Sequence, residues 1–142
     1  MNRFYQVVLT LLTPFVHILF PMKIEGVENL PEGGALICPN HSHAADPVLV
    51  AVAMGPRVPI CVMGKAQLFR FPPLGWLFRK LGAFPVERGG NDLGAIKTAL
   101  KGLQSGKKLL IFPEGTRVDH PGETGGKGGA VLLSLRSGTP LV

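Results

Sequence analysis

Short apolar runs alternate with segments of helical periodicity along most of the chain. The strand-like runs are residues 35–38, 58–63, 83–86 and 108–112. The helix-like segments are residues 47–54, 73–81, 93–103 and 130–136. Alternation of this kind is typical of helices packed over a largely parallel sheet. We therefore expect an α/β fold, a single domain with a mostly parallel or mixed central sheet flanked by helices.

Turn-forming residues mark where several of these elements start and stop. Asp46 is suited to the N-cap of the helix at 47–54, with Pro47 at the first helical position and Gly55 at the stop. Gly138 closes the last helix, and residues 140–142 then open a further strand. A strand in this fold class usually runs about 5–6 residues. We expect the domain to be truncated at its C-terminus.

The N-terminal segment has a different pattern from the rest. Between Phe4 and Phe20 the only residues that are not fully apolar are Tyr5, Gln6, Thr10, Thr13 and His17, and Pro14 lies in the middle. A membrane-spanning helix needs roughly 20 apolar residues, and no small-residue cleavage site for a signal peptide follows. We expect residues 1–21 to form a helix in the membrane interface and residues 22–142 to form the domain. The alternative is an N-terminal helix packed in the core.

Composition and charge narrow the class of protein. The chain has 142 residues, 46% of them hydrophobic, which supports one core and not two independent domains. Its net charge of +6 suits nucleic acid, anionic lipid or a phosphorylated substrate. The basic residues are dispersed, so we expect no nucleic-acid partner. Cys38 and Cys61 lie in apolar runs at a spacing that fits no zinc motif, which favours free thiols.

A histidine and an aspartate stand five positions apart after the first strand-like run. His41 and Asp46 lie in a strand-to-helix turn, where sites of α/β proteins form. A histidine accepts a proton near neutral pH, and a carboxylate on its second nitrogen would fix the tautomer. The alternatives are that Asp46 only caps the helix and His41 is a satisfied turn residue. Zinc binding that includes His43 has weak support from two histidines in one turn.

The chain lacks the pattern of an acyl-enzyme serine hydrolase. No serine occurs in a Gly-x-Ser-x-Gly turn, which leaves Ser42 as a minor candidate nucleophile. A histidine base without a nucleophile implies direct transfer, in which the hydroxyl of the substrate attacks an activated acyl carbon.

Two further segments place an arginine after a strand. They are residues 82–88, which end at Arg88, and residues 112–117, which end at Arg117. A guanidinium group binds phosphate oxygens at two points, and Gly115 allows a close approach of the backbone. Surface arginines on loops are the alternative. No Walker A pattern is present, which excludes phosphate binding by that route.

Together these segments resemble the glycerolipid acyltransferase family, in particular its 1-acylglycerol-3-phosphate acyltransferases. The first family block is Asn-His-x4-Asp, here Asn40, His41 and Asp46. The second block is represented by Gly82, Phe84, Pro85 and Arg88. The third block, Phe-Pro-Glu-Gly-Thr-Arg, is complete at residues 112–117. The order and spacing agree with the family over roughly residues 22–142, and only the opening of a fourth block is found, at 139–142.

The resemblance implies a reaction and roles for the residues that match. The acyl group would pass from acyl-CoA or acyl-carrier protein to the free sn-2 hydroxyl of 1-acylglycerol-3-phosphate (lysophosphatidic acid), which gives phosphatidic acid for phospholipid synthesis. His41 would be the base and Asp46 its orienting partner. The region that binds the acceptor phosphate would consist of Lys65, Arg88, Glu114, Gly115, Thr116 and Arg117.

The resemblance also implies partners and a location. No metal and no cofactor are expected beyond the acyl donor as co-substrate. The partners would be membrane lipid, lysophosphatidic acid and the donor, at the cytoplasmic face of a membrane, with the protein peripheral or monotopic. The alternatives are an acyltransferase that uses glycerol 3-phosphate or another lysophospholipid, and a non-catalytic membrane lipid-binding protein.

Overall fold

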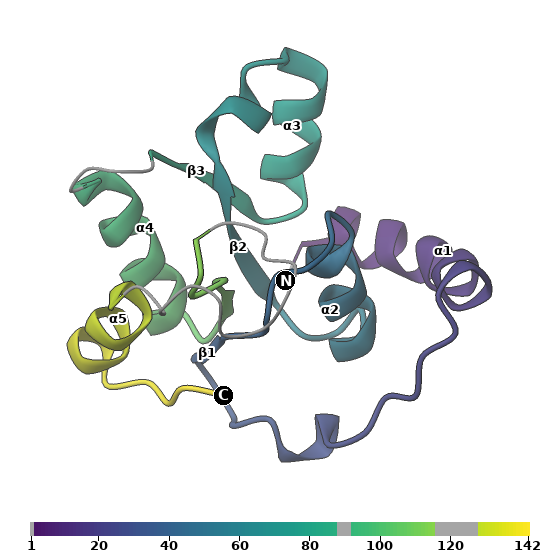
Figure 1. The fold of residues 1–142 in the computed structure, drawn as a ribbon, viewed down its shortest axis with the longest axis horizontal. Helices are drawn as coiled ribbons and strands as arrows, with labels where there is room; N and C mark the ends of the chain where they lie inside the picture. Colours follow the sequence, from purple (N-terminus) through teal and green to yellow (C-terminus); the bar gives the residue numbers. More distant parts are fainter. Residues whose placement is uncertain (1, 88–91, 116–127) are drawn as a thin grey trace.

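The computed structural model describes residues 2–87, 92–115 and 128–142. Four parallel strands form one sheet in the order β1-β4-β2-β3 (Figure 1). The strands are β1 (Ala35–Ile37), β2 (Ile60–Lys65), β3 (Ala83–Val86) and β4 (Lys108–Leu110). The expected α/β fold with a parallel sheet is therefore confirmed.

The chain segment at 140–142 extends the sheet beyond β1. Leu141 forms a parallel bridge with Leu36. The backbone N–H of Leu36 donates to the carbonyl of Pro140 at 2.9 Å, and the N–H of Val142 donates to the carbonyl of Leu36 at 2.8 Å. The extended segment expected to open at these residues is therefore present, as a single parallel bridge beside β1.

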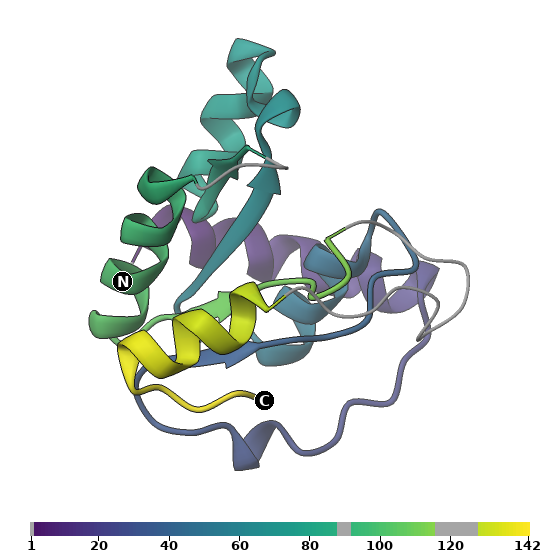
Figure 2. The ribbon, with the colours of Figure 1, turned by 60° about the vertical axis from the view of Figure 1, so that its left-hand side comes forward.

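Helices cover both faces of the sheet. They are α1 (Arg3–Leu19), α2 (Asp46–Met54), α3 (Pro72–Lys80), α4 (Leu93–Gln104) and α5 (Gly129–Ser137), with 3-10 helices η1 (Val27–Asn29) and η2 (Ala66–Phe69). Figures 1 and 2 show α1 and α2 on one side of the strands and α4 and α5 on the other. α3 extends away from the sheet beyond β2 and β3 (Figure 1).

Alternating strand residues build a separate core on each face, as the pleat of a strand requires. Ala35, Ile37 and Leu110 belong to the core under α1 and α2, whereas Leu36 and Leu109 belong to the core under α4 and α5. The first core also contains Tyr5, Leu9, Val16, Ala51, Val52, Met54 and Ile60. The second also contains Cys61, Ala99, Leu103, Ala130 and Leu133. Both faces are covered, which is the usual condition for a parallel sheet.

The expected N-terminal helix forms, and one of its faces packs in the core. α1 runs without a break through Pro14, and the Asn2 side chain caps it by accepting from the N–H of Phe4. Its buried residues are Tyr5, Leu9 and Val16, which belong to the core it shares with α2, while its opposite side is exposed. Within the described ranges no helix has the length and hydropathy needed to cross a bilayer.

One sequence-based strand boundary is wrong in detail. The strand expected at 58–63 begins later, because Val58 donates to the carbonyl of Gly55 in a turn that ends α2. The helix expected from residue 93 begins there, and Leu93 at the first position of α4 is 70% exposed. The buried residues of α4 are Ala95, Ala99, Gly102 and Leu103. Small side chains bring this helix close to the sheet, since a Cβ at Gly102 would lie 2.9 Å from the Cys61 sulfur.

Candidate active site

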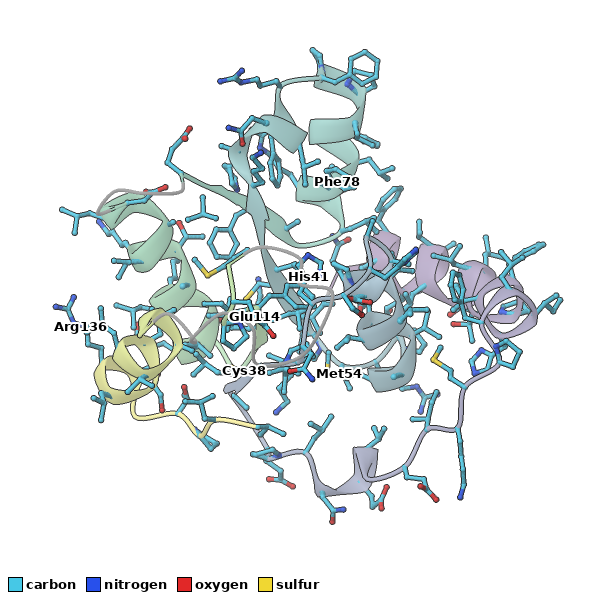
Figure 3. All side chains as sticks on the ribbon, in the orientation of Figure 1. Cys38, His41, Met54, Phe78, Glu114 and Arg136 are labelled. Carbon is cyan, nitrogen blue, oxygen red and sulfur yellow. The ribbon has the colours of Figure 1, made fainter. Side chains whose placement is uncertain are left out.

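The candidate site lies at the edge of the sheet where all four strands end. His41 follows β1, Lys65 is the last residue of β2, and Glu114 follows β4. Because the strands are parallel and β4 lies between β1 and β2, these segments reach the same edge although they are distant in sequence. In the view of Figure 3 the labelled side chains of His41 and Glu114 both project onto the centre of the molecule.

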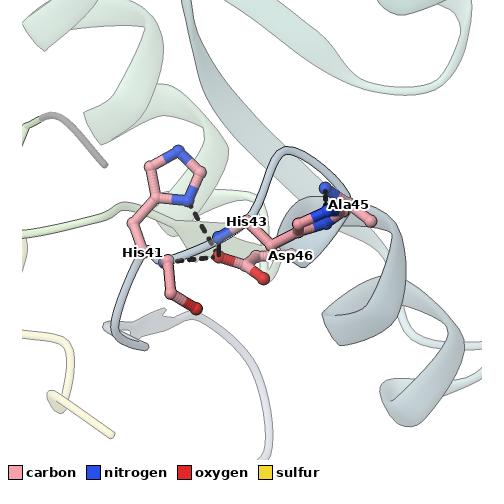
Figure 4. A network of polar contacts seen from close by, with 5 residues as sticks. His41, His43, Ala45 and Asp46 are labelled. Atoms are coloured by element: carbon pink, nitrogen blue, oxygen red, sulfur yellow. Dashed lines mark hydrogen bonds and ion pairs between the residues drawn. The ribbon is translucent and has the colours of Figure 1, made fainter. Parts of the chain in front are cut away.

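The His41–Asp46 pair predicted from the sequence forms directly. The imidazole Nδ1 of His41 lies 3.0 Å from Oδ2 of Asp46 (Figure 4). The same carboxylate oxygen accepts the backbone N–H groups of Ser42 at 2.9 Å and His43 at 2.8 Å. The two side chains are 15% and 14% exposed. The turn therefore holds the carboxylate in one position through three donors.

This arrangement corrects the capping role expected for Asp46. The N-cap of α2 is Ala45, and no side chain caps the helix. The Asp46 carboxylate instead turns back toward residues 41–43, because three donors are available there. The carboxylate is committed to the turn and to His41.

Hydrogen bonds keep the Asp46 carboxylate ionised. Partial burial raises its pKa, but the N–H of His43, the His41 ring and the N–H of Ser42 lower it by a greater amount. The net effect is a pKa below the ordinary value of 3.8. A negatively charged group thus faces the imidazole at neutral pH.

An ionised carboxylate also fixes the tautomer of His41. A carboxylate only accepts hydrogen bonds, so the neutral imidazole must donate from Nδ1, and its lone pair resides on Nε2. Figure 4 shows Nε2 pointing away from Asp46. The pair thus presents a proton acceptor with a defined direction.

Phe112, which the sequence did not single out for this role, contacts the face of the histidine ring. The ring centroids of His41 and Phe112 are 4.0 Å apart, and their planes are inclined by 24°. Phe112 comes just after β4, the neighbour of β1. Only the adjacency of two strands that are distant in sequence reveals this contact.

Glu114 lies buried beside this pair of strands. It is 8% exposed, and its Oε2 has no hydrogen-bond partner among residues 2–87, 92–115 and 128–142. Gly115 follows with a φ of 69°, a left-handed conformation that glycine adopts without strain. Its N–H donates to the carbonyl of Phe112 at 3.0 Å, which closes a tight turn.

The remaining predicted residues divide into two groups. Lys65 is exposed at the end of β2, where it pairs in register with Val86. Arg88, Thr116 and Arg117 lie outside the residues that the structure describes. The structure thus brings His41 and Asp46 into contact and places Lys65 and Glu114 at the same edge of the sheet.

The alternative of a zinc site gains no support from the geometry. Within the described part of the chain, no group of three or more His, Cys, Asp or Glu side chains is placed to hold a metal ion. Nδ1 of His43 accepts the N–H of Ala45 at 3.1 Å. Two shallow hollows of about 300 and 320 Å³ are present, one beside Gly33 and Lys108 and the other beside Ala66, Phe84 and Asp92.

Comparison with known proteins gives a consistent result. The family model described as Acyltransferase matches residues 21–142. The 1-acyl-sn-glycerol-3-phosphate acyltransferase of Bacillus subtilis is 35% identical over 122 residues, which are 85% of this chain and 60% of that protein. The enzyme of the same name from Streptococcus pneumoniae is 37% identical over 109 residues, which are 76% of this chain and 39% of that protein.

A solved structure has the same fold. The crystal structure of the 1-acyl-sn-glycerophosphate (LPA) acyltransferase PlsC from Thermotoga maritima superposes with a TM-score of 0.70 at 22% identity. The match covers 96% of this chain and 56% of that one. The chain therefore spans 60% or less of the length of each of these three proteins.

Proposed function

Because the chain belongs to the acyltransferase family, we propose that it moves a fatty acyl group from a thioester donor to the sn-2 hydroxyl of 1-acylglycerol-3-phosphate. The donor is acyl-CoA or acyl-carrier protein, and no other cofactor takes part. The observation that carries the proposal is the His41–Asp46 pair, in which Nδ1 meets the carboxylate and Nε2 points away from it. The names of the relatives from Bacillus subtilis and Streptococcus pneumoniae support this acceptor.

The proposed reaction is a direct transfer. Nε2 of His41 removes the proton from the acceptor hydroxyl as its oxygen attacks the thioester carbonyl carbon. The new C–O bond forms, the C–S bond breaks, and the leaving thiolate takes up the proton that His41 holds. The charge that develops on the imidazolium is stabilised by the ionised Asp46. No covalent enzyme intermediate forms.

The acceptor phosphate is proposed to bind along the same edge of the sheet. Lys65 lies there, and the turn at Gly115 presents backbone for a close approach. Arg88, Thr116 and Arg117 complete the proposed phosphate region by sequence. In this proposal Glu114 pairs with basic groups of the site, because a buried carboxylate is costly without a partner.

The location follows from the acceptor, which resides in a membrane. We propose that α1 lies in the interface at the cytoplasmic face, with the protein peripheral or monotopic. The product, phosphatidic acid, would enter phospholipid synthesis. Exposed apolar residues on the outer side of α1 support this placement.

A second acceptor class has support from one relative. The lyso-ornithine lipid O-acyltransferase of Pseudomonas aeruginosa is 35% identical over 99 residues, which are 68% of this chain. A relative at this level of identity thus carries a name with a different acceptor. Another lysolipid, or glycerol 3-phosphate, is the alternative acceptor for this chain.

The deciding experiment measures thioester consumption with and without lysophosphatidic acid. A panel would include glycerol 3-phosphate and lyso-ornithine lipid, each at matched concentration with acyl-CoA and with acyl-carrier protein. Acceptor-dependent consumption with lysophosphatidic acid, lost in His41→Ala, supports the proposal. Faster thioester consumption with another acceptor would identify that compound, and not lysophosphatidic acid, as the acceptor. No acceptor-dependent consumption would leave the non-catalytic lipid-binding alternative.

A further inference from the structure

The outer side of α1 carries a continuous apolar stripe. Phe4, Leu11, Phe15 and Ile18 recur at helical spacing on the side that α2 does not cover, and the last three are 64–76% exposed. The buried residues of the helix lie on a different face. Since α1 is apolar on two sides, its outer stripe needs a second covering surface.

α3 continues this stripe at the beginning of α1. The rings of Phe4 and Trp76 meet edge to face with centroids 5.7 Å apart, and the Asn2 side chain donates to the carbonyl of Lys80. Trp76 is nevertheless 55% exposed, and Phe71 at the start of α3 is 64% exposed. Figure 1 shows the end of α3 beside the start of α1. We call Phe4, Leu11, Phe15, Ile18, Phe71 and Trp76 the α1–α3 surface.

The charges around this surface have one sign. Neither residues 2–24 nor residues 60–86 contain an aspartate or glutamate. The exposed basic residues of these two ranges are Arg3, Lys23, Lys65, Arg70, Arg79 and Lys80. The Lys80 amine lies 5.9 Å from the centre of the Trp76 ring. Aromatic rings beside lysine and arginine, without acidic groups, suit the boundary between anionic headgroups and acyl chains.

We propose that the α1–α3 surface binds an anionic lipid bilayer, with α3 as a second contact element besides the N-terminal helix. Trp76 and Phe71 enter the headgroup boundary, and Arg79 and Lys80 contact lipid phosphates. α1 alone presents a stripe with few charges, whereas α3 adds the basic residues that select anionic lipid.

The surface borders the candidate site. The ring of Phe20, directly after α1, lies 6.1 Å from the ring of His43, two positions beyond His41. A bilayer seated on α1 and α3 therefore lies next to the turn that carries the base. This delivery of an acceptor from the bilayer rests on the proposed function, whereas lipid binding itself does not require it.

Point substitutions test the surface better than deletion of α1. Removing residues 1–20 would also remove Tyr5, Leu9 and Val16 from the core. The full chain would be tested in flotation with vesicles of phosphatidylcholine alone and with phosphatidylglycerol added. The substitutions are Trp76→Ala, Lys80→Gln and Arg79→Gln. The matched controls are Leu135→Ala and Arg136→Gln on α5, which are exposed on the other side of the sheet.

Trp76→Ala is expected to weaken partitioning about tenfold on both vesicle types, because it removes apolar area from the interface. Lys80→Gln and Arg79→Gln are each expected to weaken it about fivefold on anionic vesicles only, and salt should reduce this difference. The α5 controls and His41→Ala should bind as the wild type does. The α3 variants should lose turnover with an acceptor in vesicles and keep it with a soluble short-chain acceptor. This result would show that they impair binding to the bilayer and not the acyl transfer itself.

Unchanged partitioning in the α3 variants would overturn the proposal and leave α1 as the contact element. Weaker self-association of these variants without any change in vesicle binding would also overturn it, since the surface would then bind a second copy of the chain. Equal losses in the α5 controls would show that binding is not confined to this surface, and would overturn it as well.

Discussion

The imidazole of His41 lies on the ring of Phe112, with centroids 4.0 Å apart and planes inclined by 24°. One face of the histidine is thereby shielded, while its edge is held by Asp46. An aromatic face attracts a cation, so the stack favours the imidazolium that proton transfer would create. Phe112 is therefore proposed as a positioning residue for the base.

We expect Phe112→Leu to lower kcat about five- to tenfold while the acceptor KM stays nearly constant, since a contact of about 1 kcal/mol is lost from the charged state. Phe112→Tyr keeps the aromatic face and should restore most of the rate. Steady-state kinetics of both variants check this, with thermal melting as the control for folding. A leucine variant as fast as the tyrosine variant would contradict the role of the aromatic face.

His41→Ala should reduce turnover by about 10²–10⁴-fold, which is the usual loss when a general base is removed. The Asp46 carboxylate still accepts the N–H groups of Ser42 and His43 in this variant, so the melting temperature should change little. Acceptor binding, measured by calorimetry, should persist. Wild-type turnover in the purified variant would exclude His41 as the base.

Asp46→Asn should lower turnover by about 10²-fold or more, because an amide can donate to Nδ1 and select the tautomer without a lone pair on Nε2. The substitution also changes stability in a pH-dependent way. The pKa of Asp46 is lower in the folded state, so its contribution to stability is present above the ordinary value of 3.8 and is lost as the pH falls through the folded pKa. The melting temperatures of the wild type and Asp46→Asn should therefore differ at neutral pH. They should converge as the pH falls through the folded pKa of Asp46, below 3.8.

Arg88→Ala and Arg117→Ala should mainly raise the acceptor KM, because each removes a two-point contact from the proposed phosphate region. Lysine at either position should restore little, since a point charge does not reproduce the fork of a guanidinium group. Kinetics with varied acceptor at saturating donor check this. If neither alanine variant alters the acceptor dependence, the phosphate binds at other residues.

Gly34→Ala should destabilise the fold by about 1–3 kcal/mol, because the new Cβ would lie 2.3 Å from the carbonyl oxygen of Leu103. Gly129→Ala is the matched control, since no described atom lies within 4 Å of its Cβ and it begins a helix. Denaturant unfolding of both variants measures the difference. Equal midpoints would show that the loop before β1 relaxes around the added methyl group.

Local sequence signals were sufficient for the elements that begin or end at a glycine. The helix that ends before Gly55, the extended segment at 83–86 and the helix closed by Gly138 all lie within one or two residues of their expected positions. The His41–Asp46 pair was also predictable, because both residues belong to one short turn.

Contacts between distant segments were not predictable in the same way. The stack of Phe112 on His41 depends on β4 lying beside β1, and no periodicity encodes strand order. The capping role expected for Asp46 failed because donors on its N-terminal side compete with the helix for the same oxygen. The meeting of Phe4 with Trp76 likewise arises only from tertiary packing.

The strand order also determines when the site can appear during folding. Only β2 and β3 are both consecutive in sequence and paired, whereas β1 meets β4 through Ala35 and Lys108. The central strand is the last of the four to be synthesised, so β1 and β2 are linked only after a long loop has closed. Folds governed by such non-local pairing form slowly. A refolding chain would therefore regain its turnover no earlier than the step in which β4 inserts between β1 and β2.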